Sequence, residues 1–534
     1  MKLNLLSLLV FVLMLGTLPS CKKDETLASS PERVFKPIGT SGTSAETEYK
    51  LTWSPSLYTT GKKVNYLVEV AADSTFQQVL YSTTTDTTGI VFKFPDLAVK
   101  TAYIARIKAL GENGQADSKW TVVAFKIKGA EIFKALTSSN VVDNAVKLEF
   151  EGRTTLTKIV LTRTDGTFVE VAITSGDIAA GNKIISGLLS DTQYKAEIFA
   201  GDLTQGTIVF RTKAGLTGAI VDLRELVAAR PSVLNDTLNS PNLPNGAIIL
   251  LKRGATYNIS TTALLSKSFT ITSGDDINNA DKVASIYFTS NFNFSAGANI
   301  DYIEFKDVKM YSDNYTSRYI FNTTNGANVE KINFDGCRIS IFRGVTRLQS
   351  GATTVGTYSV NNCVVDSIAG YGVLTVDNIA CKANIINLKN STFYKADKIL
   401  VSRQNSTSVT IENCTFNEAP LGGGSNYLID YSTSPTNVVS GGISLKNTIL
   451  GVAKLSGTSV AVRGMRYGAG TSVIVDNTYS TSDYSATSNI IADLKAAGFT
   501  SKELFSGPAT GDFTIKASGF AGKSTSGDPR WRIQ

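Results

Sequence analysis

Cationic, acidic and aromatic residues recur between positions 343 and 403 in a pattern that suits the binding of an acidic ligand. The candidate binding residues are Arg343, Arg347, Tyr371, Asp377, Lys395, Lys398 and Arg403. Guanidinium and ammonium groups hold carboxylates through charge-assisted hydrogen bonds. A tyrosine ring adds a flat, largely apolar face. These side chains meet only if the backbone between them repeats with a regular register.

The residue types that the chain lacks restrict its chemistry. It has no histidine, which excludes Ser-His-Asp and Cys-His catalysis and His-ligated zinc. Its five cysteines show none of the close paired spacings typical of zinc or dithiol redox sites. The sequence therefore predicts no metal site and no cofactor, and it identifies no catalytic residue.

A short phrase repeats from about Gly218 onward: two apolar residues separated by one residue, followed by two polar or small residues. The second apolar positions of successive copies are Phe305, Phe334, Val360, Leu388, Ile411, Leu445 and Val475. A fixed phrase with spacers of variable length is typical of stacked coils with loops of different size. We predict that residues 215–534 form a right-handed parallel β-helix with three strands in each coil.

Asparagine closes the phrase in several copies, where it can adopt the left-handed backbone of a tight turn. These residues, which are expected to stack as an amide ladder, are Asn362, Asn390, Asn413, Asn447 and Asn477. Cys337, Cys363 and Cys414 directly follow the turn and are expected to form a buried column of small apolar groups. A disulfide between Cys337 and Cys363 stays open, and Cys381 falls outside the column as a lone thiol.

The rest of each coil follows from this register. Second strands are expected at residues 337–341, 363–368, 392–394 and 414–416, and third strands at 345–349, 373–377, 399–403 and 427–431. Second turns fall at 343–344, 370–372 and 397–398. The candidate binding residues, together with Tyr431, then share one surface, although mixed charge on a solenoid exterior also serves solubility alone. Residues 223–229 are predicted to be an amphipathic helix that caps the solenoid.

Two segments before the repeat, residues 33–128 and 129–214, alternate apolar and polar residues as half-buried strands do. Each contains a Leu-x3-Thr-x-Tyr phrase that ends at Tyr103 or Tyr194. This spacing is typical of a tyrosine corner, and both segments resemble fibronectin type III modules. Trp53 of the first is matched only by Phe150 in the second. We expect them to be spacers, with glycan contact through exposed aromatics as the alternative.

The N-terminus resembles a bacterial lipoprotein signal peptide over residues 1–20. An apolar run is followed by Leu-Pro-Ser and Cys21, whose thiol would carry the lipid. A cleaved secretory signal with a free Cys21 is the alternative. Residues 21–32 are predicted to be a tether. Its opening residues, Lys22 to Glu25, resemble the surface-export signal of Bacteroidetes lipoproteins, which implies the outer face of the outer membrane.

The formal charge is +7 over 534 residues, and loss of Lys2 with a cleaved leader leaves +6. Because no block of Lys and Arg stands out, nucleic acid is not a predicted partner. The charge is compatible with an acidic polysaccharide.

The order of these parts resembles Bacteroidetes surface lipoproteins of unknown function, which join fibronectin type III-like modules to a pectate-lyase-like β-helix. The resemblance includes residues 246–257, which look like an opening coil, and the terminal residues 528–531. It implies an all-β fold and a setting among polysaccharide-utilisation proteins, with companion glycan-uptake proteins as partners.

Three functions remain open. The favoured one is a non-catalytic protein that binds or presents a polysaccharide, for example a pectic one. The second is a Ca²⁺-dependent pectate-type lyase, which would use an Arg or Lys base and carboxylate-held calcium. The acidic cluster of Asp275, Asp276 and Asp281 gives it weak support. The third is a structural surface protein or adhesin. Whether the chain is an enzyme is left open.

Overall fold

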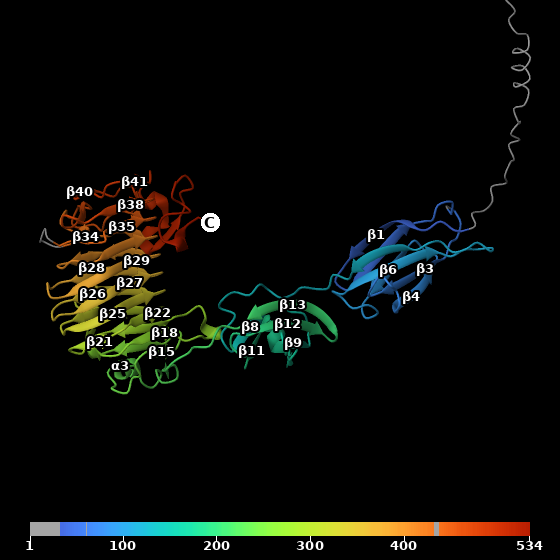
Figure 1. Cartoon of the computed structure of the whole chain (residues 1–534), viewed down its shortest axis with the longest axis horizontal. Helices are drawn as coiled ribbons and strands as arrows, with labels where there is room; N and C mark the ends of the chain where they lie inside the picture. Colours follow the sequence, from blue (N-terminus) through green and yellow to red (C-terminus); the bar gives the residue numbers. More distant parts are fainter. Residues whose placement is uncertain (1–32, 60, 432–436, 534) are drawn as a thin grey trace, which may run out of the picture. The chain divides into compact units, whose positions relative to one another are not determined.

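The computed structural model describes residues 33–59, 61–431 and 437–533 (Figure 1). The chain divides into two compact units. The first ends at Arg211, and the second comprises 212–534 together with two short segments, 137–147 and 186–191. The predicted lipid site Cys21 and the tether lie outside the described residues. None of the helices in the described part of the chain is long and apolar enough to cross a membrane.

The first sandwich is built from two antiparallel sheets, one with the order β1-β2-β5 and one with the order β4-β3-β6-β7. The strands are β1 (Ile38–Ser44), β2 (Glu48–Ser54), β3 (Tyr66–Ala71), β4 (Val79–Thr85), β5 (Gly89–Lys93), β6 (Ala102–Ala109) and β7 (Thr121–Lys126). Trp53 and Tyr103 are buried in its core. The backbone N–H of Ala98 donates to the Tyr103 hydroxyl at 3.0 Å. The predicted tyrosine corner is therefore confirmed in this module.

The second sandwich has the sheet orders β10-β9-β12-β13 and β11-β8. Its elements are β8 (Ala145–Glu149), β9 (Lys158–Arg163), β10 (Phe168–Ala172), α2 (Ser175–Ala180), β11 (Asn182–Ser186), β12 (Gln193–Ala200) and β13 (Leu203–Arg211). Tyr194 is buried and stacks on Phe210, with ring centroids 5.6 Å apart. Both modules are fibronectin type III-like sandwiches.

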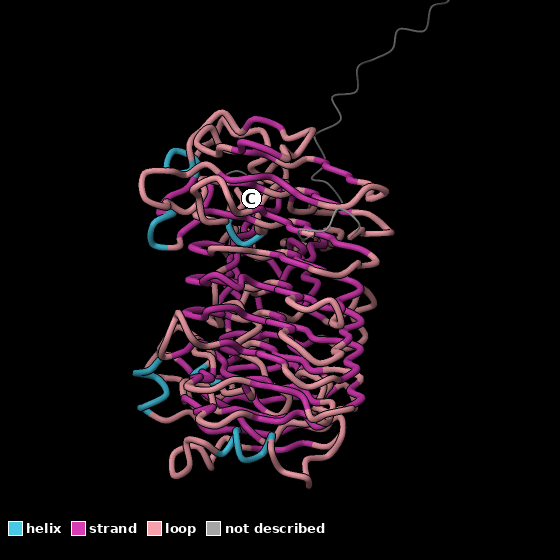
Figure 2. Tube along the Cα trace, turned by 90° about the vertical axis from the view of Figure 1, so that its left-hand side faces the viewer, coloured by secondary structure: helices cyan, strands magenta, loops and turns pink. Residues whose placement is uncertain are grey.

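The chain from residue 220 onward is a β-solenoid of about nine turns, in which successive strands pair in parallel (Figure 2). The strands of its first sheet are β14 (Ile220–Asp222), β15 (Ala247–Leu251), β18 (Phe269–Ser273), β21 (Ala298–Ile300), β22 (Ile303–Lys306), β25 (Ala327–Asp335), β27 (Thr354–Asn361), β29 (Lys382–Lys389), β32 (Ser408–Glu412), β35 (Ile443–Lys446) and β38 (Val473–Asp476). The repeat positions from Phe305 to Val475 pair one above another in this sheet. The predicted register is therefore confirmed.

The second and third strands of each coil belong to one second sheet. Its strands in the earlier coils are β16 (Thr256–Ile259), β17 (Ala263–Leu265), β19 (Ala284–Phe288), β20 (Phe292–Phe294), β23 (Val308–Ser312), β24 (Tyr319–Thr323), β26 (Arg338–Leu348) and β28 (Val364–Val376). Those in the later coils are β30 (Thr392–Ala396), β31 (Leu400–Ser402), β33 (Thr415–Asn417), β34 (Tyr427–Asp430), β36 (Ile449–Leu450), β37 (Val462–Arg466), β39 (Tyr479–Ser480), β40 (Ala486–Ser488) and β41 (Lys495–Ala496). A short 3-10 helix, η1 (Ile277–Asn279), interrupts an early loop.

The second turn of the coil differs from the prediction. Strands β26 and β28 run through the positions where turns were expected at 343–344 and 370–372. The bend instead lies at Ile341 and Ser367, whose φ angles are +64° and +54°. A single left-handed residue turns the chain while the parallel ladder to the neighbouring coil continues. The third predicted turn, at 397–398, is confirmed, because β30 ends at Ala396 and β31 begins only at Leu400.

The solenoid is capped by a different segment from the one predicted. Residues 223–229 form turns, and the helix is α3 (Val233–Leu238), beyond Pro231. Leu223 and Val227 nevertheless lie in the same buried cluster as Leu234 of α3. The cap is therefore apolar where it meets the first coil, although its helix begins later.

The four described cysteines are all buried and free, so the open question of a Cys337–Cys363 disulfide is answered in the negative. The backbone N–H of Cys337 donates to the Cys363 sulfur at 3.3 Å. Burial raises the pKa of the thiols of Cys337, Cys381 and Cys414. These groups are packing residues, because only the thiolate is a strong nucleophile.

The C-terminal segment follows the last coil and has its own small apolar core. Its elements are α4 (Ser501–Leu504), β42 (Phe505–Gly507), η2 (Pro508–Thr510), β43 (Asp512–Ile515) and η3 (Pro529–Trp531). Strands β42 and β43 pair as an antiparallel hairpin. Phe513 of this hairpin contacts Tyr394 of the solenoid, with ring centroids 5.3 Å apart. The segment therefore folds back onto earlier coils.

Candidate functional site

Six side chains from four neighbouring coils contact one another on the third-strand side of the solenoid. We call them the arginine–tyrosine cluster: Tyr319, Arg343, Arg347, Tyr371, Asp377 and Arg403. The Tyr371 ring is central, with the guanidinium carbons of Arg347 and Arg343 lying 4.1 and 4.8 Å from its centroid. Tyr319 meets the same ring edge-on at 5.6 Å. Guanidinium groups this close to an aromatic ring are held by cation–π attraction.

A difference in strand length positions Tyr371. One residue separates Phe342 from Gly344 in β26, whereas three residues separate their partners Ile368 and Gly372 in β28. This insertion supplies Tyr371. A Cβ added to Gly344 would lie 2.7 Å from Cβ of Tyr371 and 3.2 Å from the Tyr319 ring. The absence of a side chain at position 344 therefore makes room for both tyrosines.

Asp377 is the acidic centre of the cluster. Its Oδ2 accepts from Nε and Nη2 of Arg347 at 2.9 and 2.5 Å, and its Oδ1 lies 3.4 Å from Nη2 of Arg403. Arg347 also donates to Oε1 of Gln349 at 3.0 Å. The Arg347 and Asp377 side chains are each only 16% exposed, whereas Arg403 is 56% exposed. Arg347 is thus fixed from two sides, and Arg403 reaches outward.

Arg343 differs from the other two arginines. It lies over Tyr371 and, at 6.0 Å, near Tyr319. Among the described residues it forms no ion pair. Three guanidiniums and one carboxylate give the cluster a net charge of +2. Arg343 therefore carries charge that no carboxylate of the described chain neutralises.

The two lysines predicted for this surface lie outside the cluster. Lys395 donates to the carbonyl of Ala509 in the C-terminal segment at 2.8 Å. Lys398 lies beside Gly372, and no hydrogen bond or ion pair within the described chain joins its side chain to the cluster. Tyr431 was expected on the same surface, but it is 0% exposed, because it points into the solenoid core. That expectation was wrong.

Tyr319 and Gln349 were missed by sequence reasoning. Tyr319 begins β24, one coil before the first third strand that the repeat located. Extending the register backwards by one coil would have found it, since Tyr319 pairs directly with Gly344. Gln349 lies at the end of the predicted strand 345–349 but carries no charge to draw attention.

The acidic residues considered for calcium have other partners. Asp276 caps η1 by accepting from the backbone N–H of Asn278 at 2.9 Å. Asp275 accepts from Nζ of Lys213 at 3.2 Å. Within residues 33–59, 61–431 and 437–533, no group of three His, Cys, Asp or Glu side chains is arranged to hold a metal ion.

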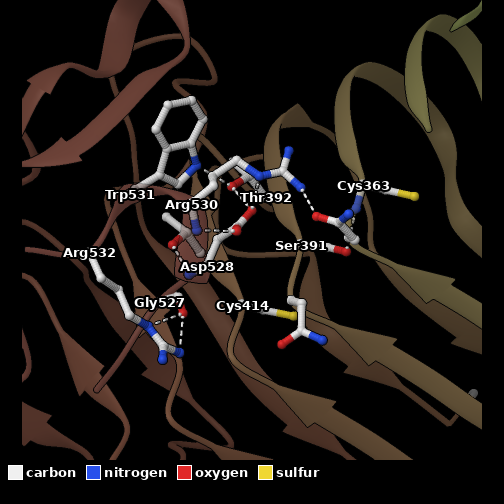
Figure 3. Close-up of polar contacts among 12 residues, drawn as sticks. Cys363, Ser391, Thr392, Cys414, Gly527, Asp528, Arg530, Trp531 and Arg532 are labelled. Carbon is white, nitrogen blue, oxygen red and sulfur yellow. Dashed lines mark hydrogen bonds and ion pairs between the residues drawn. The ribbon is translucent and has the colours of Figure 1, made fainter. Parts of the chain in front are cut away.

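A second polar group lies where the C-terminal segment crosses the asparagine turns (Figure 3). Trp531 donates from Nε1 to the Thr392 hydroxyl at 2.8 Å, and Thr392 donates to Oδ2 of Asp528 at 2.8 Å. Arg530 donates to Oδ1 of Asn362 at 2.8 Å, and Arg532 donates to Oδ1 of Asn413 at 2.7 Å. These contacts attach the C-terminus to three earlier coils.

The predicted amide ladder forms only in part. Asn413 donates to Asn390 at 2.9 Å, and Asn477 donates to Asn447 at 2.8 Å. Asn390 donates to Asn361, one residue before the predicted partner, at 2.9 Å. The predicted turn geometry itself is confirmed, since the φ angles of all five turn asparagines lie between +43° and +55°.

Two families match the solenoid, and neither has an assigned function. Residues 255–396 match a "Domain of unknown function (DUF4957)", and residues 409–531 match a "Domain of unknown function (DUF5123)". No curated protein matches the chain. The first family region contains Arg343, Arg347, Tyr371 and Asp377.

Solved structures of fibronectin type III domains are similar to part of the chain. The FN1-FN3 domains of chicken CNTN1 share 14% identity over 33% of this chain and 67% of that one, with a TM-score of 0.16. A two-domain fibronectin type III segment of chicken tenascin shares 15% identity over 33% of this chain and 99% of that one, with a TM-score of 0.18. The sandwich fold of each module is shown instead by the pairing of its own strands. The chain is thus similar to two families of unknown function.

Proposed function

We propose that this protein is a surface lipoprotein that binds or presents an acidic polysaccharide, for example a pectic one, for a glycan-utilisation system. The observation that supports this most strongly is Arg343, which stacks on Tyr371 and has no ion-pair partner in the described chain. A guanidinium held in this way keeps its donors available for a carboxylate.

The setting of Arg343 favours binding over mere solubility. The side chain of an exposed arginine ordinarily loses conformational entropy when it binds a ligand. Contact with Tyr371 and Tyr319 restricts Arg343 in advance, so less entropy remains to be lost on binding. Arg403 reaches outward from the same cluster, which gives a carboxylate-bearing chain a second cation.

The same geometry supports a binding role rather than β-elimination. A lyase needs a base that removes the proton next to the uronate carboxylate. Arginine stays protonated in proteins, and Arg347 is already paired with Asp377. We therefore propose that the cluster holds the glycan and does not cleave it.

The proposal includes an anchor. Lipid on Cys21 would hold the protein on the outer membrane, facing outward, because acyl chains add about 0.8 kcal/mol for each buried methylene. The two sandwiches would then act as spacers between the membrane and the solenoid.

The decisive experiment is affinity electrophoresis through gels that contain polygalacturonate, with dextran gels as the neutral reference. We expect the wild type to be retarded by polygalacturonate and Arg343→Gln to lose most of that retardation. Arg338→Gln is the matched control, because Arg338 is an exposed arginine on the same strand, β26, outside the cluster. It should behave as the wild type.

Other results would overturn the proposal in distinct ways. Equal retardation of Arg343→Gln and the wild type would remove the cluster as the binding site. Release of unsaturated, ultraviolet-absorbing products that stops with chelator would establish the lyase instead. Absence of binding to every acidic or neutral glycan would leave a structural surface protein or adhesin.

A further inference from the structure

A second arrangement of the same kind lies further along the third-strand side of the solenoid. It consists of Tyr427 and Asp430 on β34 and of Arg463 and Arg466 on β37. Arg466 donates from Nε and Nη2 to the two carboxylate oxygens of Asp430 at 2.6 and 2.9 Å. The guanidinium carbons of Arg466 and Arg463 lie 4.5 and 5.3 Å from the Tyr427 ring centroid. We call these four residues the distal cluster.

The distal cluster repeats the chemistry of the arginine–tyrosine cluster. In each, one tyrosine ring contacts two guanidiniums, and one of the two arginines pairs with an aspartate. The other arginine, Arg463, donates to the Tyr427 hydroxyl at 2.8 Å and, among the described residues, forms no ion pair. Arg463 is therefore the counterpart of Arg343.

Strand pairing places the two clusters along one line. Arg347 pairs with Thr375, which pairs with Val401, and the column continues through Asp430 to Arg466. Neighbouring parallel strands are about 4.8 Å apart, so these four steps separate Arg347 from Arg466 by roughly 19 Å. The line runs along the solenoid axis, perpendicular to the strands.

A further cation lies between the clusters. Lys398 precedes β31, midway along the column, and Arg403 of the arginine–tyrosine cluster follows the same strand. The two carboxylates of the series, Asp377 and Asp430, are each paired with an arginine. The six named cations and two named carboxylates leave a net charge of +4 along this side of five coils.

We infer that the ligand is a linear polyanion that runs along the solenoid axis and contacts both clusters at once. This inference rests on the proposed function and adds the substrate class: a chain long enough to span roughly 19 Å, rather than a mono- or disaccharide. Once a polymer is bound at one cluster, its contact with the other cluster is intramolecular. The polymer therefore binds far more tightly than a short ligand that contacts one cluster alone.

The test compares ligands of two lengths. Calorimetry would measure binding of a galacturonate dimer, which cannot reach both clusters, and of polygalacturonate. We expect Arg463→Gln to weaken binding of the polymer by about tenfold or more and to leave dimer binding at the arginine–tyrosine cluster unchanged. Lys495→Gln is the matched control. Nζ of Lys495 lies 5.7 Å from the ring centroid of Tyr479, so this substitution also removes one positive charge beside a tyrosine.

The outcomes separate the two proposals. If wild type and Arg463→Gln bind the polymer equally well while Arg343→Gln does not, the distal cluster takes no part and the inference fails, although the proposed function stands. If the wild type binds neither ligand, the proposed function fails. Equal weakening by Lys495→Gln would show that charge alone matters and would likewise overturn the inference. Circular dichroism of each variant checks that the solenoid is intact.

Discussion

At the scale of single residues, the arginines supply most of the positive charge of the third-strand side of the solenoid. In the arginine–tyrosine cluster Arg347 and Arg403 pair with Asp377, and in the distal cluster Arg466 pairs with Asp430. Each cluster leaves one arginine, Arg343 or Arg463, without a carboxylate partner in the described chain. A cation–π contact at an exposed site is worth about 0.5–1 kcal/mol, and exposed ion pairs are worth no more. Such contacts are too weak to explain the fold, but they are sufficient to orient the guanidiniums.

Replacement of Asp377 by Asn separates stability from binding. Asn at position 377 removes the partner of a half-buried Arg347, so we expect the free energy of unfolding to fall by about 1–2 kcal/mol. Binding of polygalacturonate should stay the same or strengthen, because a negative charge is lost beside the ligand. Urea unfolding and affinity electrophoresis measure the two effects. A folded Asp377→Asn protein that binds less tightly would contradict polyanion contact at this cluster.

The buried carboxyl group of Asp528 predicts how the stability of the protein depends on pH. Its side chain is 1% exposed, and burial raises its pKa above the ordinary 3.8, opposed by the charges of Arg530 and Arg532. Between the pKa of the unfolded chain and that of the folded protein, Asp528 is therefore protonated in the folded state and ionised in the unfolded state. Its contribution to stability is greatest below the unfolded pKa and is lost as pH rises through the folded pKa.

The free energy of unfolding of Asp528→Asn should therefore fall less than that of the wild type as pH rises through this range. Urea unfolding midpoints measured between about pH 3 and about pH 7 test this. Asp512→Asn is the control of opposite sign. Hydrogen bonds from Thr514 lower the pKa of Asp512, so its contribution is present at neutral pH and is lost on acidification. If both variants change the profile in the same direction, the assignment for Asp528 is wrong.

At the scale of elements, the bend between second and third strands depends on left-handed residues. Ile341 adopts φ +64° although it is β-branched and 39% exposed. Left-handed backbone costs about 1–2 kcal/mol for such a residue and less for asparagine. Ile341→Asn should therefore raise the free energy of unfolding by about 1 kcal/mol, measured in urea. Ser367→Asn, at the equivalent bend, should change the free energy of unfolding less. If Ile341→Asn is less stable than the wild type, the backbone of Ile341 is not strained.

The insertion in β28 makes a second prediction at this scale. A Cβ on Gly344 would press against Tyr371 and Tyr319, so Gly344→Ala should cost about 1–3 kcal/mol of stability and weaken polysaccharide retardation. Gly370→Ala is the control, because a Cβ there meets nothing within 4 Å. Equal behaviour of the two variants would show that the position of Tyr371 does not matter for binding.

At the scale of the whole molecule, the proposed lipid anchor is the testable feature. Cys21→Ser removes the only thiol to which the predicted lipid could attach, so we expect the protein to move from the membrane fraction to the soluble fraction on cell lysis. Metabolic labelling with radioactive palmitate should mark the wild type and not the variant. Cys381→Ser is the control for a lost thiol elsewhere, and label that persists on Cys21→Ser would refute the anchor.

The sequence alone determined the features that repeat. Apolar pairs from Phe305 to Val475 and the turn asparagines gave the coil register, because every coil must bury the same inward positions and turn the chain at the same point. That register predicted one surface for Arg343, Arg347, Tyr371, Asp377 and Arg403, although it predicted the same surface for Lys395, Lys398 and Tyr431, which lie outside the cluster.

Only the tertiary structure decided what does not repeat. The two-residue insertion that supplies Tyr371, the burial of Tyr431 and the distal cluster depend on side-chain direction, which a short irregular loop can change. The ladder is incomplete where Arg530 and Arg532 bind asparagines more than a hundred positions earlier in the chain. Such long-range contacts leave no local periodicity, because they form only once the coils have stacked and the C-terminus has folded back.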